Sequence, residues 1–250
     1  MDKIQIKILN LESVSQAEQM MVCAARLTQK GHQIKNLDDF MELYNKPYSN
    51  ITVASMADLP HPTIQKFGVI NIVIVGASRR FLAQITRHQN EVKFMSASCQ
   101  YSDYSHEADF TVPYELINKP EAREAYISQC TKELSEYEAF IASGIDHDSA
   151  AYMLPQGLRN VLIISATPYQ WKHMISQRVC RRNTVETRYV MLKIWQALYE
   201  LSPVLFQPST TGPFCIASSG ICLEGKMSCG NRLQAFVPDD ILKEDFPELC

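Results

Sequence analysis

A chain of 250 residues, 46% of them hydrophobic, is long enough for one globular domain or two closely fused lobes. A formal net charge of −3 excludes the broad basic field that general nucleic-acid binding needs. No apolar run has membrane-spanning length and the N-terminus lacks a signal-peptide core. We therefore expect a soluble, cytoplasmic protein that binds neither membrane nor nucleic acid.

The N-terminal region predicts one strand and two helices. Residues 3–9 alternate between apolar and polar side chains, which favours a strand. Residues 14–29 carry a helical apolar face that Gly31 ends, and residues 36–45 predict a second, short helix. The segment 46–64 is rich in Pro, Ser and Thr and predicts a loop.

A strand and a polar helix are predicted next. Residues 67–76 are rich in Val and Ile and end at Gly76, which is the strongest strand signal in the chain. Ser78 then predicts the N-cap of a helix that runs to about Glu91. Polar side chains at spacings of four, three and four share one face of this helix: Arg80, Gln84, Arg87 and Glu91. The same pattern fits an exposed helix with an Arg87–Glu91 salt bridge.

The remainder of the chain mixes helices with one further strand. Residues 92–118 have little periodicity and predict a long loop of the kind that often carries function. The elements expected after it are helices over 120–142 and 146–153, a buried strand over 161–165, and helices over about 168–180 and 184–200. The tail beyond Ser202 is predicted to be irregular. Without regular βαβ alternation, we expect an α/β or α+β fold with a mixed or antiparallel sheet flanked by helices.

Several familiar sites are excluded by their missing motifs. The chain has no GxGxxG, GxxxxGK[ST], HExxH or GxSxG pattern. Cys215, Cys222 and Cys229 are evenly spaced but lack close CxxC pairs, so no metal ligand is predicted. A metal site or a redox pair at these three residues stays an alternative. Cys180 stands beside three arginines, which favours a lowered thiol pKa and leaves cysteine catalysis open.

Two polar stretches suit ligand binding better than a core. They cover residues 84–105 and 173–184 and combine guanidinium, imidazole, amide, hydroxyl and phenol groups. Each such group costs about 1–3 kcal/mol if it is buried without a partner, whereas together they can hold a planar, phosphorylated ligand. Arg178, placed beside an aromatic heterocycle, can donate two parallel hydrogen bonds and stabilise charge that develops on a carbonyl oxygen.

Over most of the chain, and in the same order, these stretches resemble the flavin-dependent thymidylate synthases, the ThyX family. Residues 87–89 (Arg-His-Gln) through 98–102 (Ser-Cys-Gln-Tyr-Ser) resemble the hallmark Arg-His-Arg-x-x-Ser-x-Asn-Glu-x-Ser-x-Arg-Tyr motif. His173 with Arg178, followed by residues 186–188 (Glu-Thr-Arg), resembles the helix pair that ends in Glu-Ile-Arg.

The resemblance implies a ThyX-like catalytic domain over residues 1–212, followed by a Cys-containing irregular tail over 213–250. It also implies a homotetramer with FAD bound in active sites at the subunit interfaces. The enzyme would transfer a one-carbon unit from methylenetetrahydrofolate, through the flavin, to C5 of dUMP. NADPH would be the reductant, and the protein would supply positioning and electrostatics.

Site roles are carried over from the family by position. The implied FAD contacts are Arg87, His88, Gln89 and His173. The implied contacts to the pyrimidine nucleotide are Gln84, Arg87, Ser98, Gln100, Tyr101 and Arg178. The catalytic candidates are Ser98 and Arg178, and Arg178 would polarise the uracil ring.

The chain also departs from the family pattern. Gln89 replaces an arginine, and no Asn-Glu pair precedes the serine. Gln100 and Ala151 stand where two substrate-side arginines are expected, and each lost charge-assisted bond is worth roughly 1.5–3 kcal/mol. The cation that would compensate is Arg80, Lys93, Arg181 or Arg182.

These departures leave other functions open. One is a methylase or hydroxymethylase of another pyrimidine nucleotide, and another is a flavin-less binding protein on the same scaffold. A third is a thiol-based redox protein that uses Cys215, Cys222 and Cys229.

Overall fold

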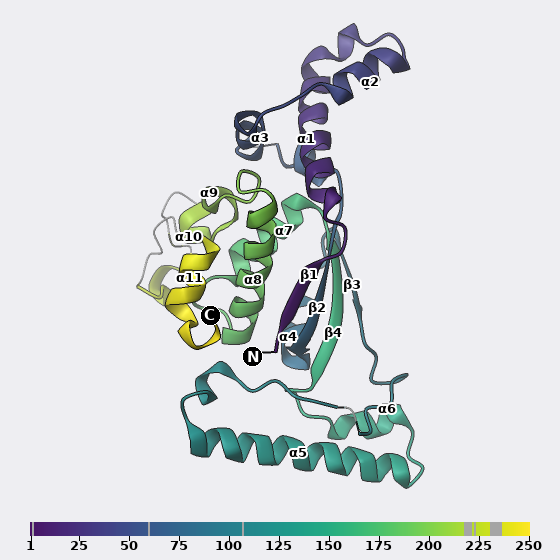
Figure 1. Cartoon of the computed structure of the whole chain (residues 1–250), viewed down its shortest axis with the longest axis vertical. Helices are drawn as coiled ribbons and strands as arrows, with labels where there is room; N and C mark the ends of the chain where they lie inside the picture. The colour runs from purple at the N-terminus through teal and green to yellow at the C-terminus, as the bar shows by residue number, and fades with distance from the viewer. Residues whose placement is uncertain (2, 60, 107, 218–221, 223, 231–236) are drawn as a thin grey trace.

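A four-stranded antiparallel sheet lies at the centre of the protein (Figure 1). The computed structural model describes residues 1–250 except 2, 60, 107, 218–221, 223 and 231–236. The strands follow the order β1-β2-β4-β3, and all three pairings are antiparallel. Their bounds are β1 Gln5–Ile8, β2 Ile70–Ser78, β3 Val92–Ser96 and β4 Arg159–Ala166. The predicted α+β class with an antiparallel sheet is confirmed.

Helices cover one face of this sheet. They are α4 (Arg79–Ile85), α7 (Pro168–Arg178) and α8 (Val185–Leu201) (Figure 1). Alternate strand residues such as Ile72 and Ile164 are fully buried beneath them, as the period of two in a strand requires. The Trp171 indole of α7 donates a 3.1 Å hydrogen bond to the Ile70 carbonyl and so fixes α7 on the sheet.

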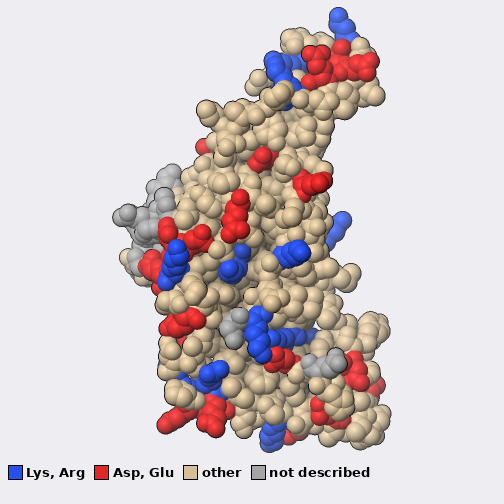
Figure 2. Space-filling model, in the orientation of Figure 1, with Lys and Arg blue, Asp and Glu red and all other residues tan. Residues whose placement is uncertain are grey.

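The opposite face of the sheet keeps apolar side chains in contact with solvent. They are Val75, Met95, Val161 and Ile163, and Met95 is 72% exposed. Among the described residues, no helix lies over this face. Figure 2 shows Lys and Arg interspersed with Asp and Glu over the visible surface, without a continuous basic field. No described helix combines the length and apolarity needed to cross a membrane.

Two helical lobes extend from the ends of the sheet (Figure 1). One contains α1 (Glu12–Lys30), α2 (Leu37–Asn45) and α3 (Asn50–Ala57). The other contains α5 (Pro120–Ala142) and α6 (His147–Ala150). The prediction of a loop over 46–64 is wrong for α3, because the Ser49 hydroxyl caps this helix by accepting from Thr52 N–H at 3.4 Å.

The predicted helix after β2 is shorter than expected. Ser78 caps α4 by accepting from Phe81 N–H at 3.1 Å, which confirms the predicted start. The helix nevertheless ends at Ile85, and Glu91 lies in the left-handed region at φ 56°. Glu91 pairs with Lys66 at 2.7 Å. The predicted polar stripe to Glu91 is therefore wrong, and no Arg87–Glu91 salt bridge forms among the described residues.

Gly76 forms a bulge inside β2 and does not end the strand. The register of β2 against β4 shifts between Val75 and Ala77, and Gly76 has φ +87°. A Cβ at this position would stand 2.9 Å from the Lys3 carbonyl oxygen, so the bulge requires glycine. The strand continues beyond the bulge to Ser78 and so delivers the N-cap of α4.

The segments predicted as loop and irregular tail both contain regular structure. β3 lies in the segment 92–118, where its apolar–polar alternation is hidden because Met95 is apolar yet 72% exposed, while Val92 and Phe94 pack on the core. Beyond Ser202 the chain forms α9 (Pro208–Thr211), α10 (Phe214–Ala217) and α11 (Pro238–Asp245). In α11, Ile241 and Leu242 are buried in the common core, so this helix is part of the globular body.

Candidate active site

The side chain of Arg178, at the end of α7, joins two parts of the chain that are far apart in sequence. Its Nε donates to His88 Nε2 at 2.8 Å, and Nη2 donates to the Gln84 carbonyl at 2.9 Å. Its Nη1 donates to Asn183 Oδ1 at 3.4 Å. Gln84 is in α4 and His88 follows that helix, so the guanidinium fixes the end of α4 against the end of α7.

A second set of contacts extends this network along α7. Asn183 donates to the Gln177 carbonyl at 2.6 Å, and the Gln177 amide lies 3.1 Å from His173 Nε2. The His173 ring meets the His88 ring edge-on, with 6.2 Å between centroids. The structure thus brings four sequence-predicted site residues together: Gln84, His88, His173 and Arg178.

His88 is held as a neutral imidazole. Its side chain is 7% exposed, and burial, followed by the charges of Arg178 and His173, lowers its pKa to about 4. The neutral ring can therefore accept the Arg178 hydrogen bond at pH 7. Burial also lowers the pKa of His173.

Arg178 and Arg87 form a positive centre without a counter-ion. Burial, followed by the charge of Arg87, lowers the pKa of the Arg178 guanidinium. Among the described residues, neither arginine has a carboxylate within ion-pair distance. The bonds to His88, Gln84 and Asn183 use three of the five Arg178 N–H groups. Two donors and an unbalanced charge therefore remain for an anionic ligand or a carbonyl oxygen.

The depressed pKa of His88 predicts a pH dependence of stability. The folded-state pKa is about 4 and the ordinary value is 6.5, so the unfolded chain takes up the proton first as the pH falls. The contribution of neutral His88 to folded-state stability is present above pH 6.5 and is lost between pH 6.5 and about 4. We expect an NMR titration to give a His88 midpoint near 4. In urea unfolding, the free energy of unfolding should fall less over this pH range in His88→Gln than in wild type.

A matched variant separates this effect from general acid sensitivity. His32 is an exposed histidine outside the network, so His32→Gln should keep the wild-type pH dependence. A His88 midpoint at or above its ordinary value would contradict the neutral, buried imidazole.

The other predicted residues lie outside this network. Ser98, Gln100 and Tyr101 belong to the loop after β3, where the Ser98 hydroxyl accepts from Gln100 N–H at 3.1 Å. Gln100 is exposed, and Tyr101 is 82% exposed. Gln89 is also exposed. No hydrogen bond within the described chain connects the loop residues to Arg178.

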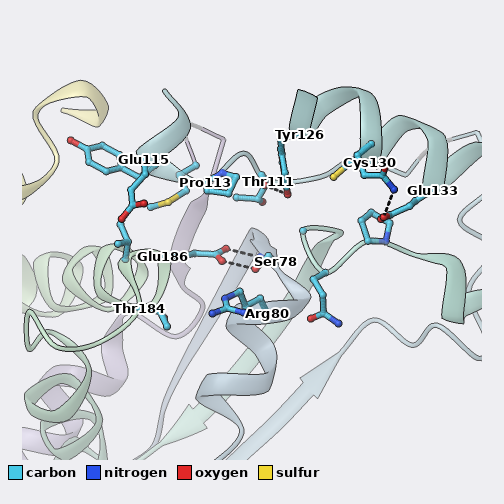
Figure 3. A pocket seen from close by; sticks show the side chains of 17 residues that line it. Ser78, Arg80, Thr111, Pro113, Glu115, Tyr126, Cys130, Glu133, Thr184 and Glu186 are labelled. Atoms are coloured by element: carbon cyan, nitrogen blue, oxygen red, sulfur yellow. Dashed lines mark hydrogen bonds between the residues drawn. The ribbon is translucent and has the colours of Figure 1, made fainter. Parts of the chain in front are cut away.

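A cavity of about 560 Å³ lies among α5, the start of α4 and the start of α8 (Figure 3). Inside it, Glu186 accepts from Ser78 N–H at 2.7 Å and also from the Ser78 hydroxyl. Arg80 lies beside this pair (Figure 3). Sequence reasoning did not predict the cavity, although Glu186 of the helix-pair motif and the Ser78 cap both line it.

The cations proposed to replace the missing arginines are not equally available. Arg181 bonds to Glu244 at 2.6 Å and to Asp245 at 2.8 Å. Arg182 lies 3.9 Å from Glu224. Arg80 lines the large cavity and has no carboxylate at ion-pair distance in the described part of the chain.

A smaller cavity, of about 300 Å³, adjoins the Arg178 network. Gln177, Arg178 and Asn183 form one wall, and Cys180 lies beside them. The lowered thiol pKa predicted for Cys180 is wrong, because burial raises its pKa and outweighs the hydrogen bond from the Arg182 backbone. A resting nucleophilic thiolate at Cys180 is therefore not supported.

A comparison of the chain with known protein families supports the resemblance seen in the two polar stretches. The family model described as thymidylate synthase complementing protein (Thy1) matches residues 10–204. The chain belongs to the Thy1 family. The resemblance seen in the motifs is thereby confirmed, since both polar stretches lie within the matched region.

Similar proteins extend the family match. A flavin-dependent thymidylate synthase of Geobacter sulfurreducens is 22% identical over 230 residues, which cover 92% of this chain and 96% of that protein. One from Thermococcus onnurineus is 26% identical over 173 residues, covering 67% and 69%. The solved structure of the UMP/dUMP methylase PolB from Streptomyces cacaoi, bound with 5-Br dUMP, has a TM-score of 0.63 and 16% identity. It covers 82% of this chain and 93% of its own, and it shares the fold.

Proposed function

We propose that this protein is a flavin-dependent thymidylate synthase, which transfers a one-carbon unit from methylenetetrahydrofolate to C5 of dUMP with FAD and NADPH. The observation that carries the proposal is the positive centre of Arg87 and Arg178 beside the buried, neutral His88. These residues stand at the positions that the family motifs assign to flavin and nucleotide, and the relatives named above are such enzymes.

The donor set around His88 suits a flavin. An exposed guanidinium at Arg87 can bind phosphate, and the partly exposed imidazole of His173, whose ring meets the buried His88 ring edge-on, offers a flat surface for a ring system. Phe214 adds a third ring 6.2 Å from His173. In this assignment Arg87, His88, Gln89 and His173 hold FAD. When it is bound, FAD supplies the redox chemistry that no side chain can provide.

The task of Arg178 is to polarise the pyrimidine. Its remaining N–H groups can donate to a uracil carbonyl oxygen, which stabilises negative charge there and favours bond formation at C5. His88 and the Gln84 carbonyl hold the guanidinium in place from one side. Because they engage it before the substrate arrives, little reorganisation is needed during the reaction.

The loop with Ser98, Gln100 and Tyr101 fits a site completed by another subunit. Tyr101, which is 82% exposed, contributes nothing to the core of its own chain, but it can line the nucleotide site of a neighbour. The exposed apolar face of the sheet supports the self-association that this requires. We therefore propose a homotetramer. Light scattering after gel filtration should give four times the chain mass of 28.4 kDa, and a monomer would contradict the shared site.

The two arginines that the family pattern places beside the substrate are absent, so another cation has to bind the substrate phosphate. Gln100 and Ala151 carry no charge, and Arg80, four residues before Gln84, has no carboxylate at ion-pair distance in the described part of the chain. A second candidate function follows from the same absence, namely methylation or hydroxymethylation of another pyrimidine nucleotide. The fold shared with a UMP/dUMP methylase supports keeping this candidate.

An anaerobic turnover assay tests the proposal. It contains FAD-loaded protein, NADPH, methylenetetrahydrofolate and dUMP, and product mass is read at the base. We expect the mass gain of one methyl group. A hydroxymethyl product, or turnover only with another pyrimidine nucleotide, would establish the second candidate. A protein that neither binds FAD nor turns over would overturn both and favour a binding protein.

A further inference from the structure

Four of the eight cysteines line one cavity. Cys180 follows α7, Cys215 lies in α10, and Cys222 and Cys229 come from the tail, yet all four border the 300 Å³ cavity beside Arg178. The other four are not part of this cavity, and one of them, Cys99, accepts a hydrogen bond from Arg79. We propose that Cys180, Cys215, Cys222 and Cys229 form a four-thiolate site for a thiophilic metal centre, either a zinc ion or an iron–sulfur cluster.

The composition of the cavity selects this class of ligand. Four cysteine sulfurs with no histidine among the lining residues are the donor set that zinc and iron–sulfur clusters prefer. A redox pair would need only two thiols. The even spacing of Cys215, Cys222 and Cys229 thus acquires a fourth partner, Cys180, that lies 35 residues before Cys215 in the sequence.

The charges around the cavity are also suitable. Four thiolates around a divalent ion, or around the common four-iron cluster, leave a net charge of about −2. The guanidinium groups of Arg178, Arg181 and Arg182 line the same cavity, and the first of these has no carboxylate partner in the described part of the chain. Arg178 therefore offers unbalanced positive charge to a bound anionic centre, whereas Arg181 and Arg182 are already paired with carboxylates.

The thiols are not yet assembled around a single point. Within the described ranges, no three His, Cys, Asp or Glu side chains are positioned to hold an ion. Metal binding displaces thiol protons and would draw the sulfurs of the four side chains, which already border one cavity, toward a common point. Cys180 and Cys215 are free thiols, so neither is withheld by a disulfide.

A metal centre here would act as a positioning element. Gln177, Arg178 and Asn183 belong both to this cavity and to the hydrogen-bond network around Arg178. Cross-linking Cys180 to α10 and the tail would fix the end of α7, and with it the guanidinium. The metal site does not depend on the flavin assignment, because its four ligands are distinct from the proposed FAD contacts.

Metal analysis of the full chain, purified without oxygen from iron- and zinc-supplemented medium, tests the proposal. We expect about one centre per chain by elemental analysis. Iron with acid-labile sulfide would identify a cluster, and zinc without iron would identify a single ion. Each of Cys180→Ser, Cys215→Ser, Cys222→Ser and Cys229→Ser should lower metal content at least about tenfold. The matched control Cys250→Ser changes an exposed cysteine outside the cavity, and this variant should retain its metal.

A second measurement covers variants that fail to fold. Removing the metal from the wild-type chain with a chelator should increase the number of thiols that react with a maleimide by four, counted by mass. A chain without metal, with these thiols free or paired as disulfides, would overturn the proposal. So would metal that survives all four substitutions. Loss of FAD binding with metal retained would count against the proposed function alone.

Discussion

Arg178→Ala should lower turnover of the FAD-loaded protein by at least about 10²-fold while leaving FAD bound. The variant removes the two N–H groups assigned to the uracil carbonyl and the positive charge behind them. It also frees His88 Nε2 and the Gln84 carbonyl, which accept from the guanidinium at 2.8 Å and 2.9 Å. FAD should stay bound because Arg87, Gln89 and His173 are still present. Flavin absorption of the purified variant and steady-state turnover are the two readouts.

Two control variants define the role of Arg178. Arg178→Lys keeps the charge but cannot reproduce the planar fork that reaches His88, Gln84 and a carbonyl together, so turnover should stay low. Arg123→Ala removes an exposed arginine from α5 and should leave turnover unchanged. Wild-type turnover in Arg178→Ala would contradict the polarising role, and loss of FAD would place Arg178 in cofactor binding.

Asp245→Ala should lower the free energy of unfolding by about 3–5 kcal/mol. Asp245, at the end of α11, accepts hydrogen bonds from both Arg181 and Arg188. The exposed fraction of its side chain is 12%, and that of Arg188 is 9%. Removing the carboxylate leaves two poorly hydrated guanidinium groups without their shared partner and removes the ion pair between α11 and α8. Urea unfolding at pH 7 measures the change.

Glu244 provides the matched control for Asp245. It bonds to the same Arg181 at 2.6 Å, but its side chain is 48% exposed. Water can replace a lost partner at such a site, so Glu244→Ala should cost less than about 1 kcal/mol. Equal effects of the two substitutions would show that burial of the Asp245 carboxylate does not stabilise the C-terminal helix.

Local signals in the sequence were sufficient where short-range chemistry decides the structure. The bounds of α5 agree with the predicted 120–142, because a proline start and a long amphipathic pattern mark it. Ser78 was recognised as a cap for the same reason. The predictions failed at α3, where hydroxyl-bearing residues were assigned to a loop although one caps a helix. They also failed at β3, whose pairing partner β4 is more than 60 residues away.

The sequence by itself determined the family, the polar stretches that carry the site, and the α+β class, since motif order and periodicity are properties of neighbouring residues. Only the tertiary structure decided how distant groups meet. Arg178 and His88 are 90 residues apart, and their hydrogen bond exists because α4 and α7 pack on the same face of one sheet. Cys180 borders the same cavity as Cys215, Cys222 and Cys229 because α10 packs against α7. No sequence period encodes such contacts, because they follow from burial of the shared core.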